Sequence, residues 1–239
     1  MIIITRRKFV TFLFFSILFV AALISHDNNT SEVFSGKLTK RIIIDAGHGF
    51  PDGGAVGARG TIESTLNLRI SKRIEKELKK KGYTVIMTRT GEDSPISGED
   101  TISNKKHKDM YRRLSIINNS EADLFVSIHM NKFGDSRYRG AQVIYSGNFT
   151  QSHSVAQFIQ AELNFLPENF SKRTQLKAPD SIFLLRKAEI PAVIVECGFL
   201  SNFEEEELLQ TPKYQQKLSK AIVKGIEKYY NSERKDSSL

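Results

Sequence analysis

The segment Arg41-Ile-Ile-Ile-Asp-Ala-Gly-His-Gly49 decides the predicted fold, because its apolar, β-branched run ends abruptly in glycines around one histidine. Such a run predicts a buried strand that delivers His48 to a sharp turn. Apolar residues then recur at every fourth position between about residues 62 and 81, which predicts an amphipathic helix, and residues 83–88 predict a second buried strand. A strand, a helix and a strand in this order form a crossover unit, so we expect the two strands to be parallel.

The rest of the chain continues this alternation of apolar runs and helical patterns. We expect further helices over residues 108–118, 151–165 and 211–230, and further strands over residues 123–129, 140–145, 182–185 and 192–196. Residues 89–107 and 167–180 are rich in turn-forming or polar residues and predict surface loops. The pattern indicates one α/β domain built on a mostly parallel sheet.

Four ionisable residues stand at the predicted ends of these elements. His48 and His129 follow or close apolar strands, Glu63 opens the first helix, and Glu196 closes the strand over residues 192–196. Ligands of an open parallel sheet gather at the carboxyl ends of its strands, so we expect the four side chains to converge. Two imidazoles and a carboxylate are the ligand set of a catalytic zinc ion with an open position, which leaves Glu196 as the candidate base.

Other residues near these positions have two readings each. Asp45 and Asn131 can orient the imidazoles from behind, or can be ordinary turn residues at strand ends. Each histidine taken singly fits a structural role as well as a ligand role. Cys197 is the one cysteine of the chain, which excludes an intramolecular disulfide. It neighbours Glu196 on a strand, so we expect its thiol to be buried on the opposite face and inert.

Composition restricts the class of protein further. At 239 residues, the chain has room for one full-sized domain and a short appendage. An excess of 35 Lys and Arg over 27 Asp and Glu gives a net charge of +8, which favours acidic polymers and surfaces. The charge is dispersed and no nucleic-acid motif is present, so we expect no nucleic-acid partner.

The N-terminus has the composition of an export signal. Arg6, Arg7 and Lys8 precede an uncharged apolar run over residues 9–24, with no clear cleavage site after it. We therefore expect residues 1–25 to be an uncleaved signal anchor, with a cleaved signal peptide as the alternative. Residues 26–39 read as a linker, residues 40–232 as the catalytic domain and residues 233–239 as a disordered tail.

Four ordered motifs carry a resemblance to a known family. Asp45-Ala-Gly-His-Gly49, Glu63, Ser127-Ile-His-Met-Asn131 and Val195-Glu-Cys-Gly-Phe-Leu-Ser-Asn202 together resemble the zinc-dependent N-acetylmuramoyl-L-alanine amidases of bacteria. The short form with an N-terminal membrane signal is similar to the germination-specific, spore-cortex branch of that family. The resemblance implies a single α/β domain with a twisted, mostly parallel six-stranded sheet and helices on both faces.

The resemblance also implies site residues and an activity. His48, Glu63 and His129 match the family's Zn²⁺ ligands, and Glu196 matches its catalytic glutamate. Arg113 matches a recurrent family arginine whose role the sequence does not define. The implied reaction is hydrolysis of the amide between muramic acid and L-alanine in peptidoglycan, after which a separate deacetylase forms muramic-δ-lactam in the spore cortex.

Expected partners, location and rival functions complete this interpretation. We expect peptidoglycan as substrate, the membrane as a partner through the N-terminal segment, and a lipoprotein-type activating partner. The expected location is the cell-wall side of the membrane, in the intermembrane or cortex region of the developing spore. A zinc peptidase that cuts within the stem peptide, and a wall-binding protein without catalysis, are the alternatives.

Overall fold

The computed structural model describes residues 39–94, 101–168 and 171–236. The predicted signal segment over residues 1–25, almost all of the predicted linker and residues 237–239 of the predicted tail lie outside the described residues. Within the described part of the chain, no helix combines the length and the apolar character needed to cross a bilayer.

The domain is built on one six-stranded sheet with the strand order β2-β1-β3-β6-β4-β5. Its strands are β1 (Arg41–Ala46), β2 (Thr84–Met87), β3 (Leu124–Asn131), β4 (Gln142–Tyr145), β5 (Leu176–Lys177) and β6 (Ala192–Phe199). The strands β2, β1, β3 and β6 are mutually parallel, whereas β4 runs antiparallel to β6 and pairs in parallel with β5. The predicted mostly parallel six-stranded sheet is therefore confirmed.

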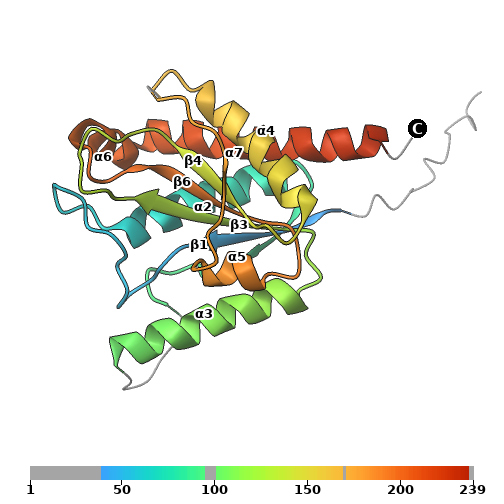
Figure 1. Cartoon of the computed structure of the whole chain (residues 1–239), viewed down its shortest axis with the longest axis horizontal. Helices are drawn as coiled ribbons and strands as arrows, with labels where there is room; N and C mark the ends of the chain where they lie inside the picture. The colour runs from blue at the N-terminus through green and yellow to red at the C-terminus, as the bar shows by residue number, and fades with distance from the viewer. Residues whose placement is uncertain (1–38, 95–100, 169–170, 237–239) are drawn as a thin grey trace, which may run out of the picture. The chain divides into compact units, whose positions relative to one another are not determined.

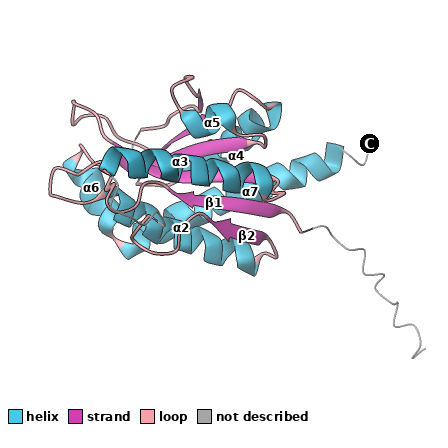
Figure 2. Ribbon diagram, turned by 90° about the horizontal axis from the view of Figure 1, so that it is seen from below, coloured by secondary structure: helices cyan, strands magenta, loops and turns pink. Residues whose placement is uncertain are grey.

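Helices cover both faces of the sheet, as predicted (Figure 1). On one face lie α2 (Glu63–Lys80), α4 (Thr150–Asn164) and α7 (Pro212–Asp236). On the other lie α3 (Ile102–Asn119) and the short α5 (Phe183–Lys187), seen in front of the sheet in Figure 2. Side chains alternate along β1, so Ile42 and Ile44 pack into the first layer and Ile43 into the second.

Three elements differ from the sequence-based expectation. Residues 182–185 were predicted as a strand, but Phe183–Lys187 form α5. A short apolar run carries no periodicity that separates a buried strand from a buried helix, which explains the error. The strand β5 lies inside the predicted loop over residues 167–180, and the helix α6 (Phe203–Gln210) was not predicted.

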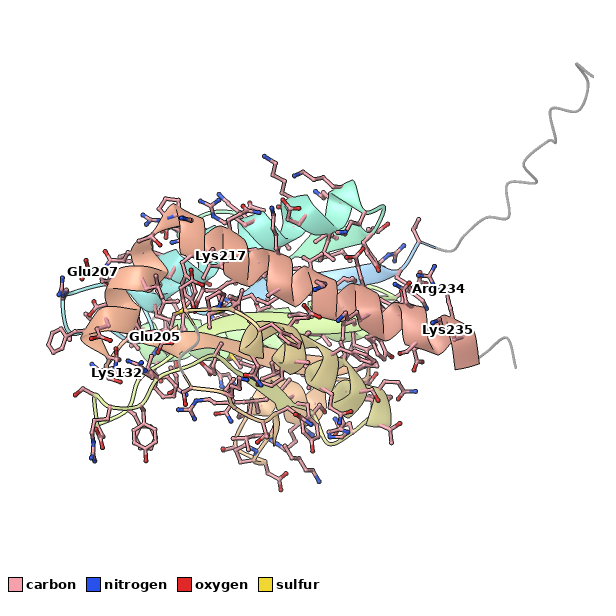
Figure 3. All side chains as sticks on the ribbon, turned by 90° about the horizontal axis from the view of Figure 1, so that it is seen from above. Lys132, Glu205, Glu207, Lys217, Arg234 and Lys235 are labelled. Carbon is pink, nitrogen blue, oxygen red and sulfur yellow. The ribbon has the colours of Figure 1, made fainter. Side chains whose placement is uncertain are left out.

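Two predicted helices are longer than expected. The helix α3 begins at Ile102, because the hydroxyl oxygen of Thr101 accepts a hydrogen bond from the Asn104 amide at 3.3 Å and caps it. The helix α7 continues to Asp236, into the tail that was predicted to be disordered from residue 233. Its last turn carries Arg234 and Lys235, which Figure 3 labels near the C-terminal end of the helix. Positive charges in the last turn interact favourably with the helix dipole, which stabilises the extended helix.

The crossing of α4 and α7 depends on one small residue, Gly225. A Cβ atom added there would lie 2.5 Å from the Cα and 2.8 Å from the backbone nitrogen of Ile159 on α4. Both contacts are to backbone, which cannot move aside as a flexible side chain does. The two helices therefore approach as closely as they do because position 225 has no side chain.

We expect Gly225→Ala to destabilise the domain, although alanine is the better helix former by about 1 kcal/mol. Overpacking against the α4 backbone should cost about 1–3 kcal/mol and lower the midpoint of denaturant unfolding. Gly134→Ala is the matched control, since no atom lies within 4 Å of a Cβ built there. Equal midpoints for the two variants would contradict this account of the helix crossing.

Candidate metal centre and active site

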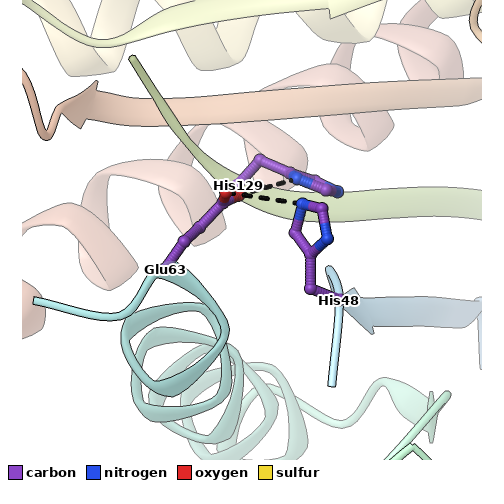
Figure 4. A group of neighbouring side chains, drawn as sticks. All are labelled: His48, Glu63 and His129. Atoms are coloured by element: carbon purple, nitrogen blue, oxygen red, sulfur yellow. Dashed lines mark hydrogen bonds and ion pairs between the residues drawn. The ribbon is translucent and has the colours of Figure 1, made fainter. Parts of the chain in front are cut away.

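Three ionisable side chains from distant parts of the chain meet beside the carboxyl ends of β1 and β3 (Figure 4). The Oε1 atom of Glu63 lies 3.0 Å from Nδ1 of His129, and its Oε2 atom lies 3.4 Å from Nε2 of His48. One ligand atom from each of the three residues lies within 4.8 Å of the others. A single cation can therefore contact all three side chains at once.

Two glycines permit this close approach. A Cβ atom at Gly47 would lie 2.2 Å from Nε2 of His129, so the turn after β1 passes directly against that imidazole. A Cβ atom at Gly54 would lie 2.6 Å from Oε2 of Glu63, and Gly54 has a φ of +71°. Any larger side chain at these positions would push the three ionisable groups apart.

Glu63 is buried at the start of α2 and is held from several sides. Its carboxylate accepts hydrogen bonds from the backbone amides of Ala55 at 2.8 Å and Met130 at 3.1 Å. Burial disfavours its ionised form, but hydrogen bonds from His129 and His48 outweigh burial and hold the pKa of Glu63 well below its usual range. The carboxylate is therefore charged and fixed in place.

Asp52 orients the imidazole of His48, a role for which Asp45 and Asn131 were the candidates from sequence. Its Oδ2 atom lies 2.9 Å from Nδ1 of His48, and Lys106 of α3 pairs with its other oxygen at 2.8 Å. Burial disfavours a charged imidazole, but the hydrogen bonds to Asp52 and Glu63 raise the pKa of His48 to about 9. A carboxylate four residues after His48, in a glycine-rich loop that turns back, was the signal available in the sequence.

Neither Asp45 nor Asn131 forms a hydrogen bond with an imidazole among the described residues. The carboxylate of Asp45 accepts hydrogen bonds from Ser127, Thr88 and Arg113 instead. Burial opposes its ionisation, but these partners, led by Arg113, lower the pKa of Asp45. The backbone carbonyl of Asn131 accepts from the Leu200 amide at 2.8 Å, and no hydrogen bond joins the Asn131 side chain to either histidine in the described part of the chain.

Glu196 lies on β6 beside His129, to which it is the paired residue in the strand register. Its Oε2 atom is buried and, among the described residues, has no hydrogen-bond partner. Burial raises the pKa of Glu196 to about 7. Buried carboxylate oxygens without partners are rare, because they cost free energy, and they are typical of groups kept for chemistry or for a ligand.

Cys197 points to the other side of the sheet, as its position after Glu196 predicts. It is completely buried in the layer that contains α2, α4 and α7, and it is a free thiol. Burial raises its pKa well above the usual range, so it stays protonated. The thiol is a packing group and is not available to a metal beside Glu63.

A cavity of about 320 Å³ adjoins the two histidines on the α3 and α5 side of the sheet. Its lining includes His48 and His129, the apolar residues Phe125 and Ile194, and Lys105. It offers a bound molecule an apolar wall next to the ionisable cluster. Concave sites with few polar groups are the usual form of small-molecule pockets.

The chemistry of the donor set fits a zinc ion. Zinc is bound in catalytic sites by imidazole nitrogens and carboxylate oxygens, and one further coordination position of the metal stays open there. Asp52 orients one of these imidazoles in the manner of the outer partners of metal ligands. The structure thus brings together His48, Glu63 and His129, with Glu196 adjacent, as the sequence predicted.

Comparisons with known proteins agree with this geometry. A model of the family described as N-acetylmuramoyl-L-alanine amidase matches residues 42–228, which include the four ionisable residues. The germination-specific N-acetylmuramoyl-L-alanine amidase of Bacillus subtilis is 37% identical over 230 residues, covering 94% of this chain and 95% of the relative.

Solved structures show the same similarity. The CwlD amidase of Clostridioides difficile, solved in complex with the GerS lipoprotein, has 39% identity and a TM-score of 0.78, covering 81% of this chain and 100% of its own. The catalytic domain of the amidase CwlV from Bacillus (Paenibacillus) polymyxa has 30% identity and a TM-score of 0.67, covering 81% and 99%. The chain therefore belongs to the N-acetylmuramoyl-L-alanine amidase family.

Proposed function

We propose that this chain hydrolyses the amide bond between muramic acid and L-alanine in peptidoglycan, with a zinc ion held by His48, Glu63 and His129. The observation that carries the proposal is the convergence of these three side chains, with Glu196 beside them, whose buried Oε2 atom has no hydrogen-bond partner among the described residues. Membership of the amidase family supports the choice of peptidoglycan as substrate.

The residues divide the chemical work among themselves. A zinc ion, when bound, would polarise the substrate carbonyl and acidify a water molecule. Glu196 takes the proton from the attacking water and passes it to the departing nitrogen of L-alanine. Asp52 keeps the His48 ring in one orientation, and the adjoining cavity gives the substrate a place beside the cluster.

A spore-cortex role is the biological setting that we propose, with removal of the stem peptide preceding muramic-δ-lactam formation by a separate deacetylase. The similarity to the germination-specific amidase of Bacillus subtilis supports it. In this proposal residues 40–232 are the catalytic domain, and residues 1–25 hold it at the cell-wall side of the membrane.

Digestion of purified peptidoglycan tests the reaction directly. Mass spectrometry of the products should show intact stem peptides with a free amine on L-alanine, and glycan strands that keep an unsubstituted lactyl group. New amines within the stem would instead identify a peptidase. An absence of any new amine, even with the lipoprotein partner added, would identify a binding protein without catalysis.

We expect His48→Ala and His129→Ala to lose zinc and activity together, because each removes one of only three proposed protein ligands. Metal analysis of the purified variants, alongside turnover of peptidoglycan, measures both effects. His153→Ala is the matched control, since His153 contacts Gln175 and Tyr145 and is not part of the cluster. Full zinc content in His48→Ala or His129→Ala would remove that residue from the site.

We expect Glu196→Gln to keep its zinc but to lower turnover by about 10²-fold or more, because the amide retains the shape of the side chain but cannot accept the proton. Steady-state kinetics with metal analysis of the same sample separates the two properties. Turnover close to that of the unchanged protein would return Glu196 to a structural role.

A lipoprotein-type partner is the last part of the proposal, supported by the complex in which the similar Clostridioides difficile amidase was solved. We expect the purified chain to be folded but weakly active or weakly loaded with metal on intact wall, and a lipoprotein from the same cell to raise both quantities. Zinc content and wall digestion, measured with and without the partner, test this expectation. A chain that is fully loaded and fully active alone would exclude the need for one.

A further inference from the structure

Arg89, which follows β2, is an unusual feature of this site because its guanidinium group is buried among backbone carbonyls. It donates hydrogen bonds to five of them. The acceptors and distances are Ala46 at 2.9 Å, Gly47 at 3.0 Å, His48 at 2.7 Å, Ser64 at 2.8 Å and Gly91 at 2.8 Å. One side chain thus joins the turn after β1, the start of α2 and its own loop.

The turn that Arg89 holds is conformationally demanding. His48 has a φ of +60°, a left-handed conformation that residues other than glycine adopt at a cost. Such a conformation persists only where surrounding contacts fix the backbone. Here Arg89 and Arg113 both donate to the carbonyls of Ala46 and His48, on either side of the turn.

The contact with Ser64 extends this hold to the second ligand. Ser64 follows Glu63 directly, so a guanidinium that binds the Ser64 carbonyl fixes the backbone next to Glu63 as well. Asn67 makes a second, weaker link, because its amide nitrogen donates to the Gly47 carbonyl at 3.1 Å and to Oε1 of Glu63 at 3.2 Å. Both links join the His48 turn to the first turn of α2.

The contacts of Arg89 differ in kind from those of an arginine in a structural ion pair. In the described residues its hydrogen bonds go to carbonyl oxygens, and no salt bridge joins it to a carboxylate. Burial and the nearby Arg113 lower its pKa to about 10, so the cation is kept at a cost. A lysine has its three donors on one atom and cannot span these acceptors, whereas the planar guanidinium presents five donors in a fixed fork.

We propose that Arg89 is a positioning residue for the metal centre, which sets the separation of His48 and Glu63 by binding the carbonyls of their two backbone segments. The inference rests on the proposed function, because it takes these two residues as zinc ligands. It assigns no contact between Arg89 and the metal or the substrate. Removing the guanidinium should leave all three ligands present but less well arranged.

The variants Arg89→Lys and Arg89→Gln test the inference. We expect zinc affinity to fall by about 10–100-fold, the usual effect of losing an outer partner of a metal ligand. Zinc dissociation constants come from competition with a chromophoric chelator, at a temperature well below unfolding. The visible absorption spectrum of the cobalt-substituted protein reports the ligand geometry independently of activity, and we expect it to change in both variants.

Gln160→Ala is the matched control for a merely structural effect. Gln160 of α4 is 2% exposed and Arg89 is 3% exposed, and both side chains bind backbone groups. Gln160 binds the amide of Val143 on β4 and the carbonyl of Ala141, which directly precedes β4. We expect this control to lower the unfolding temperature without changing zinc affinity or the cobalt spectrum. Arg89→Lys should change all three quantities.

The outcomes distinguish the two proposals. Failure of the unchanged protein to bind zinc, both alone and with the lipoprotein partner added, would overturn the proposed function. Zinc binding by the unchanged protein, with the same affinity and cobalt spectrum in folded Arg89→Lys, would overturn only the positioning role. If neither Arg89 variant folds while Gln160→Ala does, Arg89 is a stability residue and the inference is likewise wrong.

Discussion

The parallel pairing of β1, β3 and β6 is the constraint on which the site depends. The strand register places Asp45 opposite Ser127 and His129 opposite Glu196. Side chains far apart in the sequence therefore lie together at the carboxyl ends of these central strands. Parallel strands need crossover connections, and those connections supply α2 with Glu63 at its first turn. The arrangement of the cluster is thus a consequence of the sheet topology.

Much of this was predictable from sequence because the relevant signals are local. A β-branched run ending at His48, and a helical stripe beginning near Glu63, specify both the element and the residue at its end. Short elements gave no such signal. The run over residues 182–185 was predicted as a strand and is part of α5, since a few apolar residues satisfy either period.

The supporting contacts could not be predicted for a different reason. Asp52 reaches His48 through loop geometry, for which the only signal in the sequence is a carboxylate four residues after the histidine. In the described residues, the acceptors of Arg89 are backbone carbonyls, which every residue carries, so no sequence pattern marks them. Asp45 looked like a partner of His48 because it is close in the sequence. It is instead the buried counter-charge of Arg113, another contact that depends on the packing of α3.

The placement of Cys197 has a consequence for durability. The chain's one thiol is buried, protonated and turned to the far side of the sheet from the ionisable cluster. Oxidants, disulfide exchange and soft metals act on accessible thiolates, which this residue does not provide. A protein of this kind, held for long periods outside the reducing cytoplasm, would therefore need no reductase to keep its cysteine in the thiol form.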